Sequence, residues 1–130
     1  MDAIQVPIFV ESRYRANRKR IQSAIANLLK KHEIKGSVEV SVAIIGNRKM
    51  RELSKKYKRE DKAHDILSFS QTEGETTYLP KDNVLRLGDI VISYPEVIKQ
   101  ASEEEMLVDD KIDELLEHGL NHLLGINHEE

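Results

Sequence analysis

The sequence has no cysteine and no tryptophan, and aromatic residues make up only 5% of its 130 positions. The absence of cysteine excludes disulfide frameworks and metal sites built from thiolates, and it favours a reducing, cytoplasmic location. The shortage of aromatic rings argues against extensive stacking on nucleobases. The N-terminus lacks a basic segment followed by an apolar run, and no apolar stretch is long enough to cross a bilayer. Neither a secretory signal nor a membrane partner is therefore expected.

The composition that is present fits one folded domain spanning residues 1–130. Hydrophobic residues make up 39% of the chain and charged residues 33%, a balance typical of globular proteins. The charges are unevenly placed, because residues 1–62 hold sixteen Lys and Arg against seven Asp and Glu, whereas residues 63–130 hold four against sixteen. A basic half can be a footprint for a polyanion, but ordinary solvated helix faces explain it equally well.

Four segments have the alternation or the apolar content of strands, and they lie at residues 4–10, 38–45, 65–70 and 87–93. Pro7 cannot donate to a strand ladder, so the first of them is expected at a sheet edge. Residues 71–86 are rich in turn-forming residues and predict a loop that is long enough to suggest a functional role.

Four helices are expected between and after these strands. The first carries apolar residues at helical spacing from Ile21 to Leu29, and the second begins at an Asn47 N-cap with Met50, Leu53 and Tyr57 turned inward. Ser93 and Glu96 form a capping box that opens the third, and the fourth covers residues 109–124. This order predicts a single α+β (α/β-like) domain with a central, mostly mixed four-stranded sheet packed with helices.

Three histidines near the C-terminus have the spacing of a metal site. His118 and His122 are four residues apart, so on a helix they project from one face, one turn apart. Gly125 can adopt a positive φ and turn the chain, which would bring His128 back to the same ion. Three neutral imidazoles suit Zn²⁺, or Ni²⁺, with a fourth position left open. The pattern therefore predicts one transition-metal ion, although three surface histidines remain the alternative.

The spacing HxxxHxxGxxH is also that of zinc proteases of the metzincin type. Those enzymes carry a glutamate, their general base, directly after the first histidine. Gly119 stands at that position here. A protease would need its base from elsewhere, so the spacing alone does not favour peptide hydrolysis.

Three linked motifs resemble the YbeY family of bacterial metal-dependent endoribonucleases and rRNA maturation factors. The histidine string is similar to one family motif, residues 57–69 (YKREDKAHDILSF) to a second, and residues 87–93 (LGDIVIS) to a third. The motifs occur in the family's order and span most of the chain. The matching positions of the string are His118, Gly119, His122, Leu123, Gly125 and His128.

The resemblance implies a single-strand-specific endoribonuclease that acts in rRNA maturation, at the 3′ end of 16S rRNA, and in ribosome quality control. It implies a precursor rRNA, the small ribosomal subunit and assembly factors as partners of a cytoplasmic monomer. The family's motif arginine aligns with Lys58, next to Arg59, and its Pro-Thr pair aligns with Ala63 and His64. These departures concern catalysis and substrate choice and leave the proposed metal ligands unchanged.

Cleavage of a phosphodiester needs positive charge opposite the charge that develops on phosphorus. Lys58, or less favourably Arg59, is the candidate for that role, although both also fit an exposed basic helix end. Asp65, Ser68 and Asp89 are polar residues in otherwise apolar strands. One of the two carboxylates is suggested to orient a metal-bound histidine, and strand-end capping is the alternative.

A wider set of basic residues predicts contacts to an RNA backbone that tolerate sequence and weaken steeply with salt. The set consists of Arg13, Arg15, Arg18, Lys19, Arg20, Arg48, Lys49, Arg51, Lys55 and Lys56. Two other readings remain open: a non-catalytic ribosome-assembly factor whose metal stabilises its C-terminus, and a metallohydrolase acting on peptides or small molecules.

Overall fold

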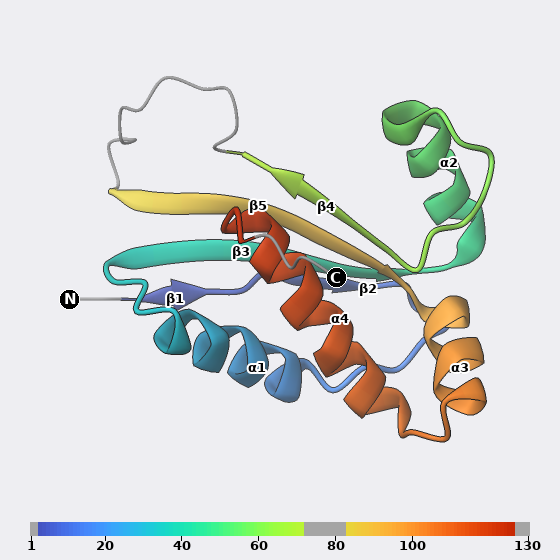
Figure 1. Ribbon diagram of the computed structural model, residues 1–130, viewed down its shortest axis with the longest axis horizontal. Helices are drawn as coiled ribbons and strands as arrows, with labels where there is room; N and C mark the ends of the chain where they lie inside the picture. The colour runs from blue at the N-terminus through green and yellow to red at the C-terminus, as the bar shows by residue number, and fades with distance from the viewer. Residues whose placement is uncertain (1–2, 72–82, 127–130) are drawn as a thin grey trace.

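The computed structural model describes residues 3–71 and 83–126. They form a sheet with helices on both faces (Figure 1). The strands are β1 (Ile4–Gln5), β2 (Ile8–Val10), β3 (Ser37–Ile45), β4 (Ile66–Ser70) and β5 (Val84–Ser93). The helices are α1 (Arg18–Lys31), α2 (Asn47–Lys58), α3 (Tyr94–Glu103) and α4 (Val108–Leu123).

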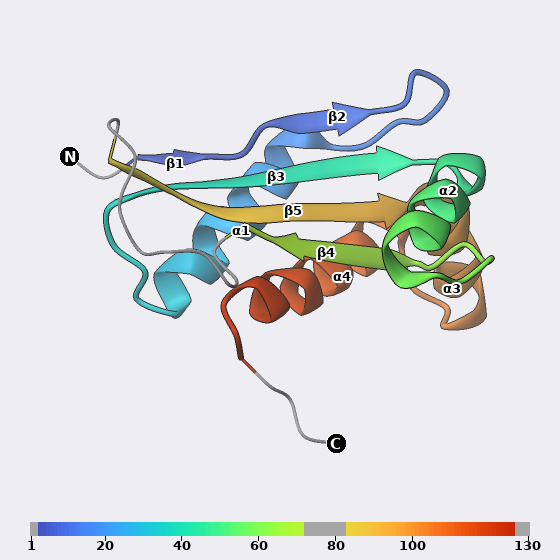
Figure 2. The same cartoon turned by 90° about the horizontal axis from the view of Figure 1, so that it is seen from above.

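The sheet is mixed, with β4 at one edge. Its order is β1-β3-β5-β4, and β2 also pairs with β3, in continuation of β1. The pairs of β3 with β1, β2 and β5 are parallel, whereas β4 runs antiparallel to β5 (Figure 2). The predicted α+β class with a mixed sheet is confirmed, but the count of four strands is wrong. The expected first strand is interrupted at Val6 and Pro7, where proline has no N–H to continue the ladder.

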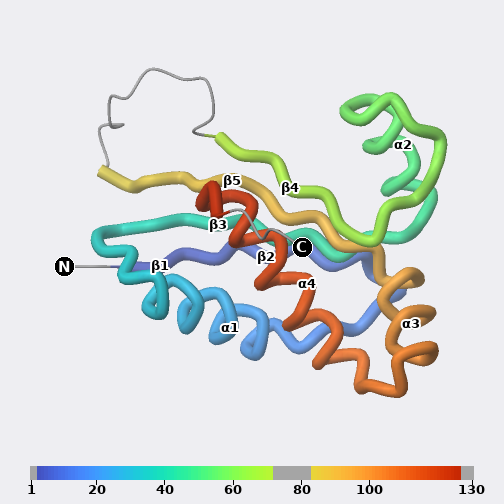
Figure 3. The backbone as a smooth tube through the Cα atoms, viewed as in Figure 1, coloured from blue at the N-terminus to red at the C-terminus, as the bar shows by residue number. Residues whose placement is uncertain are grey.

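The main core lies between the sheet and the pair α1 and α4, which run across the same face (Figures 1 and 3). Ile25 and Leu29 of α1 and Leu116 and Leu120 of α4 are fully buried there. The opposite face carries α2 over one end of the sheet, where Met50 packs into a smaller cluster. No helix of the described residues is long and apolar enough to span a membrane.

Three local expectations are corrected. Gly46, not Asn47, caps α2; Asn47 is its first residue, and its Nδ2 donates to Glu96 at 3.4 Å while its Oδ1 accepts from Ser93. Tyr57 is 53% exposed and therefore not part of the buried core, although its ring contacts Phe69. Strand β5 begins at Val84, inside the predicted loop 71–86. Residues 72–82 of that loop lie outside the described residues.

The predicted cap of α3 is confirmed, because the hydroxyl oxygen of Ser93 accepts a hydrogen bond from the Glu96 N–H at 3.3 Å.

Lys111 anchors the start of α4. Its ammonium is almost fully buried and donates to Glu114 at 2.7 Å and to Glu104 at 3.0 Å. Burial alone would lower the pKa of Lys111, but the bonds to the two carboxylates outweigh it and raise the pKa. These ion pairs join the end of α3 to the helix that carries the histidines.

Gly88 is required where β5 passes β4, and Gly88→Ala is expected to destabilise the protein. Gly88 has φ +147°, and an added Cβ would overlap the carbonyl oxygen of Phe69 and come within 2.9 Å of Leu123. Backbone strain and overlap together are expected to lower the free energy of unfolding by about 2–3 kcal/mol, measured by urea denaturation. The control is Gly36→Ala, which meets nothing within 4 Å at φ +92° and carries the backbone strain alone. Equal losses for the two variants would contradict the overlap.

Candidate active site at the edge of the sheet

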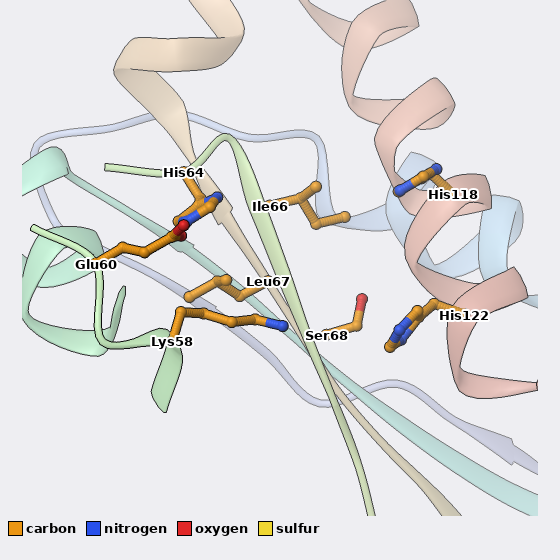
Figure 4. A pocket seen from close by; sticks show the side chains of 8 residues that line it. All are labelled: Lys58, Glu60, His64, Ile66, Leu67, Ser68, His118 and His122. Atoms are coloured by element: carbon orange, nitrogen blue, oxygen red, sulfur yellow. The ribbon is translucent and has the colours of Figure 1, made fainter. Parts of the chain in front are cut away.

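Helix α4 presents His118 and His122 to solvent. The buried face of this helix is formed by residues such as Leu116, Leu120 and Leu123, which pack against the sheet. The two histidines are exposed and lie beside that apolar face, as their four-residue spacing predicted. Both project toward the same side of α4, next to β4 (Figure 4).

Gly119 lets α4 approach β4 closely between the two histidines. A Cβ at this position would lie 2.9 Å from the Ile66 side chain and 3.1 Å from the Ser68 Oγ. Ser68 also donates a long hydrogen bond, 3.5 Å, to the Gly119 carbonyl oxygen. Gly119 therefore permits close packing of α4 on β4, which holds the histidines at the edge of the sheet.

The other wall of the site comes from the segment between α2 and β4. Helix α2 ends at Lys58, and Arg59 takes the left-handed conformation with φ 57°, which turns the chain back. The Lys58 side chain extends toward Ser68, and His64 contacts the Glu60 carboxylate through Nε2 (Figure 4). A basic group and a carboxylate–imidazole pair thus face the helix that bears His118 and His122.

These two walls enclose a pocket of about 390 Å³ beside β4. Its lining combines two predicted metal ligands, a cation and an acid–base pair, which come from segments far apart in the sequence. The lining residues are Lys58, Glu60, His64, Ile66, Leu67, Ser68, His118 and His122.

The two predicted metal ligands that the structure describes, His118 and His122, fit a site for a transition-metal ion. Beyond α4, Gly125 has φ +76°, and the N–H groups of Gly125 and Ile126 bond to the carbonyls of His122 and Asn121. This arrangement ends the helix and turns the chain, as predicted. His128 lies outside the described residues, and among residues 3–71 and 83–126 no three side chains form a metal-binding group. Two imidazoles on one pocket wall are ligands of the kind that zinc takes.

Several predicted site residues lie elsewhere. Arg59 is exposed and does not line the pocket. Asp65 accepts a hydrogen bond from Gln100 of α3 at 3.1 Å, and Asp89 lines a different pocket. Of the three polar strand residues, only Ser68 lines the pocket beside the histidines. The suggestion that Asp65 or Asp89 orients a metal-bound histidine stays a prediction. In the structure neither carboxylate lines the pocket of the histidines.

The sequence motifs did not single out Glu60, and they marked His64 only as a departure from the family motif. The two residues are four apart, a spacing that lets their side chains meet in a helical turn. However, they lie in the connection after α2, where no periodicity marked them. The signal that could have found them is the Glu-x-x-x-His spacing itself, beside the matched motif.

Comparison with known proteins places these features in a family. The sequence model described as "Endoribonuclease YbeY" matches residues 9–130, which include both histidines and the Lys58 segment. The chain belongs to the YbeY family. The resemblance of the three motifs is thereby confirmed.

Named YbeY proteins align over most of this chain. One from Roseiflexus castenholzii is 33% identical over 109 residues, covering 84% of this chain and 69% of the relative. One from Francisella philomiragia is 36% identical over 114 residues, covering 86% and 70%. Both are named "Endoribonuclease YbeY". A solution structure of a Thermotoga maritima protein matches the fold with a TM-score of 0.60 at 23% identity, covering 98% of this chain and 75% of that protein.

Proposed function

We propose that this chain is a metal-dependent endoribonuclease that cuts single-stranded RNA in the pocket beside β4. The observation that carries the proposal is the gathering of Lys58, His118 and His122 around one pocket in a member of the YbeY family. Its relatives are named endoribonucleases, which are hydrolases of phosphodiester bonds. Maturation of rRNA is the process in which we place it.

His118, His122 and His128 would hold the ion. Their imidazole donors suit Zn²⁺, and Ni²⁺ is the other ion that fits them. When bound, it would supply Lewis-acid chemistry at a phosphoryl oxygen and activate water. Lys58 faces this position from the other wall, where its ammonium can stabilise charge on the phosphate.

Glu60 and His64 are proposed as the proton-transfer pair. The Glu60 carboxylate contacts Nε2 of His64, which fixes the ring and leaves Nδ1 to exchange a proton with the attacking or leaving oxygen. Their place in the pocket opposite the metal ligands suits that task.

Both His64→Ala and Glu60→Gln are expected to lower kcat by roughly tenfold to a hundredfold, the range for loss of one acid–base group. KM and bound metal should be unchanged, because neither residue is a proposed ligand. The measurement is the rate of cleavage of labelled single-stranded RNA at saturating substrate. Replacing His64 with threonine, the family's residue, tests whether this chain depends on its own histidine. A wild-type kcat in all three variants would contradict the role.

Removal of the metal is expected to abolish cleavage. Incubation with a chelator, followed by its removal, should leave a folded but inactive protein, and added Zn²⁺ should restore both activity and one bound ion per chain. Metal content is measured beside the rate, so that a contaminating ribonuclease is recognised. Cleavage that persists unchanged without metal would argue against the proposal.

The basic residues of α2 would track the RNA backbone. Arg48, Lys49 and Lys56 are exposed on this helix, which ends at Lys58 of the pocket lining. Arg20 is less available, because its hydrogen bonds to Asp113 and Asp110 raise its pKa and tie α1 to α4. A cytoplasmic monomer acting on the small ribosomal subunit remains part of the proposal.

A second function, a non-catalytic ribosome-assembly factor, is favoured by one observation: Lys58 stands where the family motif has arginine. Lysine is a point charge without the bidentate fork of a guanidinium. Stoichiometric binding of RNA or subunits without turnover would support this reading. No observation favours the peptide or small-molecule hydrolase.

A further inference from the structure

A second pocket lies on the sheet face that carries α2, opposite α1 and α4. It has a volume of about 550 Å³ and is mainly apolar. Figure 2 shows that α2 covers only one end of this face and leaves the middle strands uncovered by the described helices. The pocket is separate from the histidines, because the side chains of successive strand residues point to opposite faces.

The floor of this pocket is low because its residues are small. In the register of the sheet, Ser41 of β3 lies beside Asp89 of β5, and Ala43 lies beside Val91. Aromatic rings stand on both sides of this floor. Phe9 pairs with Ala43 from the β2 edge, and Phe69 pairs with Asp89 from the β4 edge. The result is a trough between rings, which we call the aromatic trough.

The rings at its rim are accessible. Phe9 is 52% exposed and Tyr57 is 53% exposed, an unusual placement for large apolar side chains of a folded protein. Tyr57 meets Phe69 edge to face with ring centroids 5.0 Å apart, so the two rings form one wall. Sequence composition argued against stacking on bases, but the fold collects half of the six Phe and Tyr residues at this one site.

Positive charge flanks both walls. The Lys49 ammonium lies 5.5 Å from the centroid of the Phe9 ring, and the Lys56 ammonium lies 5.2 Å from that of Tyr57. Between the walls, the Asp89 carboxylate has no hydrogen-bond or ion-pair partner within residues 3–71 and 83–126, although its backbone is part of the sheet. Rings for stacking, cations for phosphate and a carboxylate acceptor are together the groups that recognise an unpaired nucleotide whose base bears an amino group.

The aromatic trough also adjoins the candidate active site. Tyr57 lines the trough and Lys58 lines the pocket of the histidines; likewise Phe69 lines the trough and Ser68 that pocket. Edge strand β4 alone separates them, so an RNA strand crossing this edge would contact both.

We propose that the aromatic trough binds unpaired nucleobases of the RNA, one stacked on the Tyr57–Phe69 wall with its amino group donating to the Asp89 carboxylate, and a neighbouring one stacked on Phe9. The inference rests on the proposed function and adds a subsite that selects a base with an amino group, such as cytosine, over uracil beside the cleavage position. Uracil offers only a carbonyl oxygen where cytosine has its amino group, so the Asp89 carboxylate would disfavour it.

The test measures binding separately from cleavage. Short fluorescent homopolymers of cytidine and of uridine are titrated with metal-free wild type, Phe9→Ala, Asp89→Asn and Ile98→Ala, in chelator, by anisotropy. Ile98 is a matched control, an exposed apolar residue on α3 outside the trough. We expect Phe9→Ala to weaken binding of both homopolymers about tenfold, the loss of one stacked base. Asp89→Asn should reduce the preference for cytidine over uridine about fivefold, because the neutral amide can also donate its N–H to the uracil carbonyl oxygen. Ile98→Ala should bind as wild type.

A second measurement locates the contact. Cytidine monophosphate added to isotope-labelled protein should shift the backbone resonances of Phe9, Ala43 and Asp89 more than uridine monophosphate does. Equal binding by Phe9→Ala, Asp89→Asn and wild type, with unmoved trough resonances at saturating oligonucleotide, would overturn the proposal and leave this face to a protein partner. Absence of metal-dependent cleavage by wild type would instead refute the nuclease, whatever these titrations show.

Discussion

His122→Ala is expected to lower the rate of RNA cleavage by about a thousandfold, because it would remove a ligand of an ion whose transition-state stabilisation is worth several kcal/mol. His122 is exposed on α4 and takes no part in the main core, so the fold should persist. The measurement is single-turnover cleavage of a labelled single-stranded RNA, beside bound metal and far-UV circular dichroism.

Glu117→Ala is the matched control for this prediction. Glu117 is exposed on the same helix, next to His118, and its nearest ionic partner is Lys31 at 3.8 Å. It should cleave as wild type does. The His118→Ala variant and the double variant should be about as inactive as His122→Ala, because ligands of one ion act as a unit. Wild-type cleavage by His122→Ala, with metal still bound, would refute the assigned ligand.

The helix that carries the histidines could be predicted from the sequence because its signals are local. The i, i+4 spacing predicts that His118 and His122 share a face of the helix. The apolar residues between them predict that this face borders the core. Gly125 likewise marks the helix end through a positive φ that most other residues avoid. None of these inferences needed knowledge of the tertiary arrangement.

The position of Asp89 could not be predicted in this way. Alternation along β5 shows that Asp89 and Val91 share one face, and Ile90 and Ile92 the other. Both faces of this strand are largely buried, so the sequence does not indicate which of them α4 covers. In the structure α4 packs on the face of Ile90, which places Asp89 with the aromatic residues. The Asp89 carboxylate therefore lies on the face opposite α4, and its suggested role in orienting a metal-bound histidine stays a prediction.

Capping of α2 was mispredicted for a related reason. Asn47 has the side chain of an N-cap, but its amide is used in bonds to Ser93 and Glu96 of the distant α3 region, and the cap position falls to Gly46. Local propensity favoured the cap, and a tertiary contact decided otherwise.

Lys58→Ala is expected to lower kcat by about a hundredfold to a thousandfold, the usual cost of removing one group that stabilises transition-state charge. KM should change little, because the backbone contacts proposed for α2 remain. Lys58→Arg should keep or raise the wild-type rate, since the family motif has arginine at this position and its fork can hold two phosphate oxygens. The measurement is kcat and KM on the same RNA, with equal metal content in all variants.

Arg59→Asn separates a specific role of Lys58 from a general loss of positive charge. It removes the neighbouring charge, and asparagine tolerates the left-handed conformation found at this position, φ 57°. Because Arg59 does not line the pocket, this variant should keep kcat within about twofold and weaken binding only in a salt-dependent manner. If Lys58→Ala and Arg59→Asn lost activity equally, Lys58 would contribute only to the general positive charge near the pocket and would have no specific role at the phosphate. If neither lost activity while His122→Ala did, stabilisation of the phosphate would fall to the metal and the Glu60–His64 pair alone.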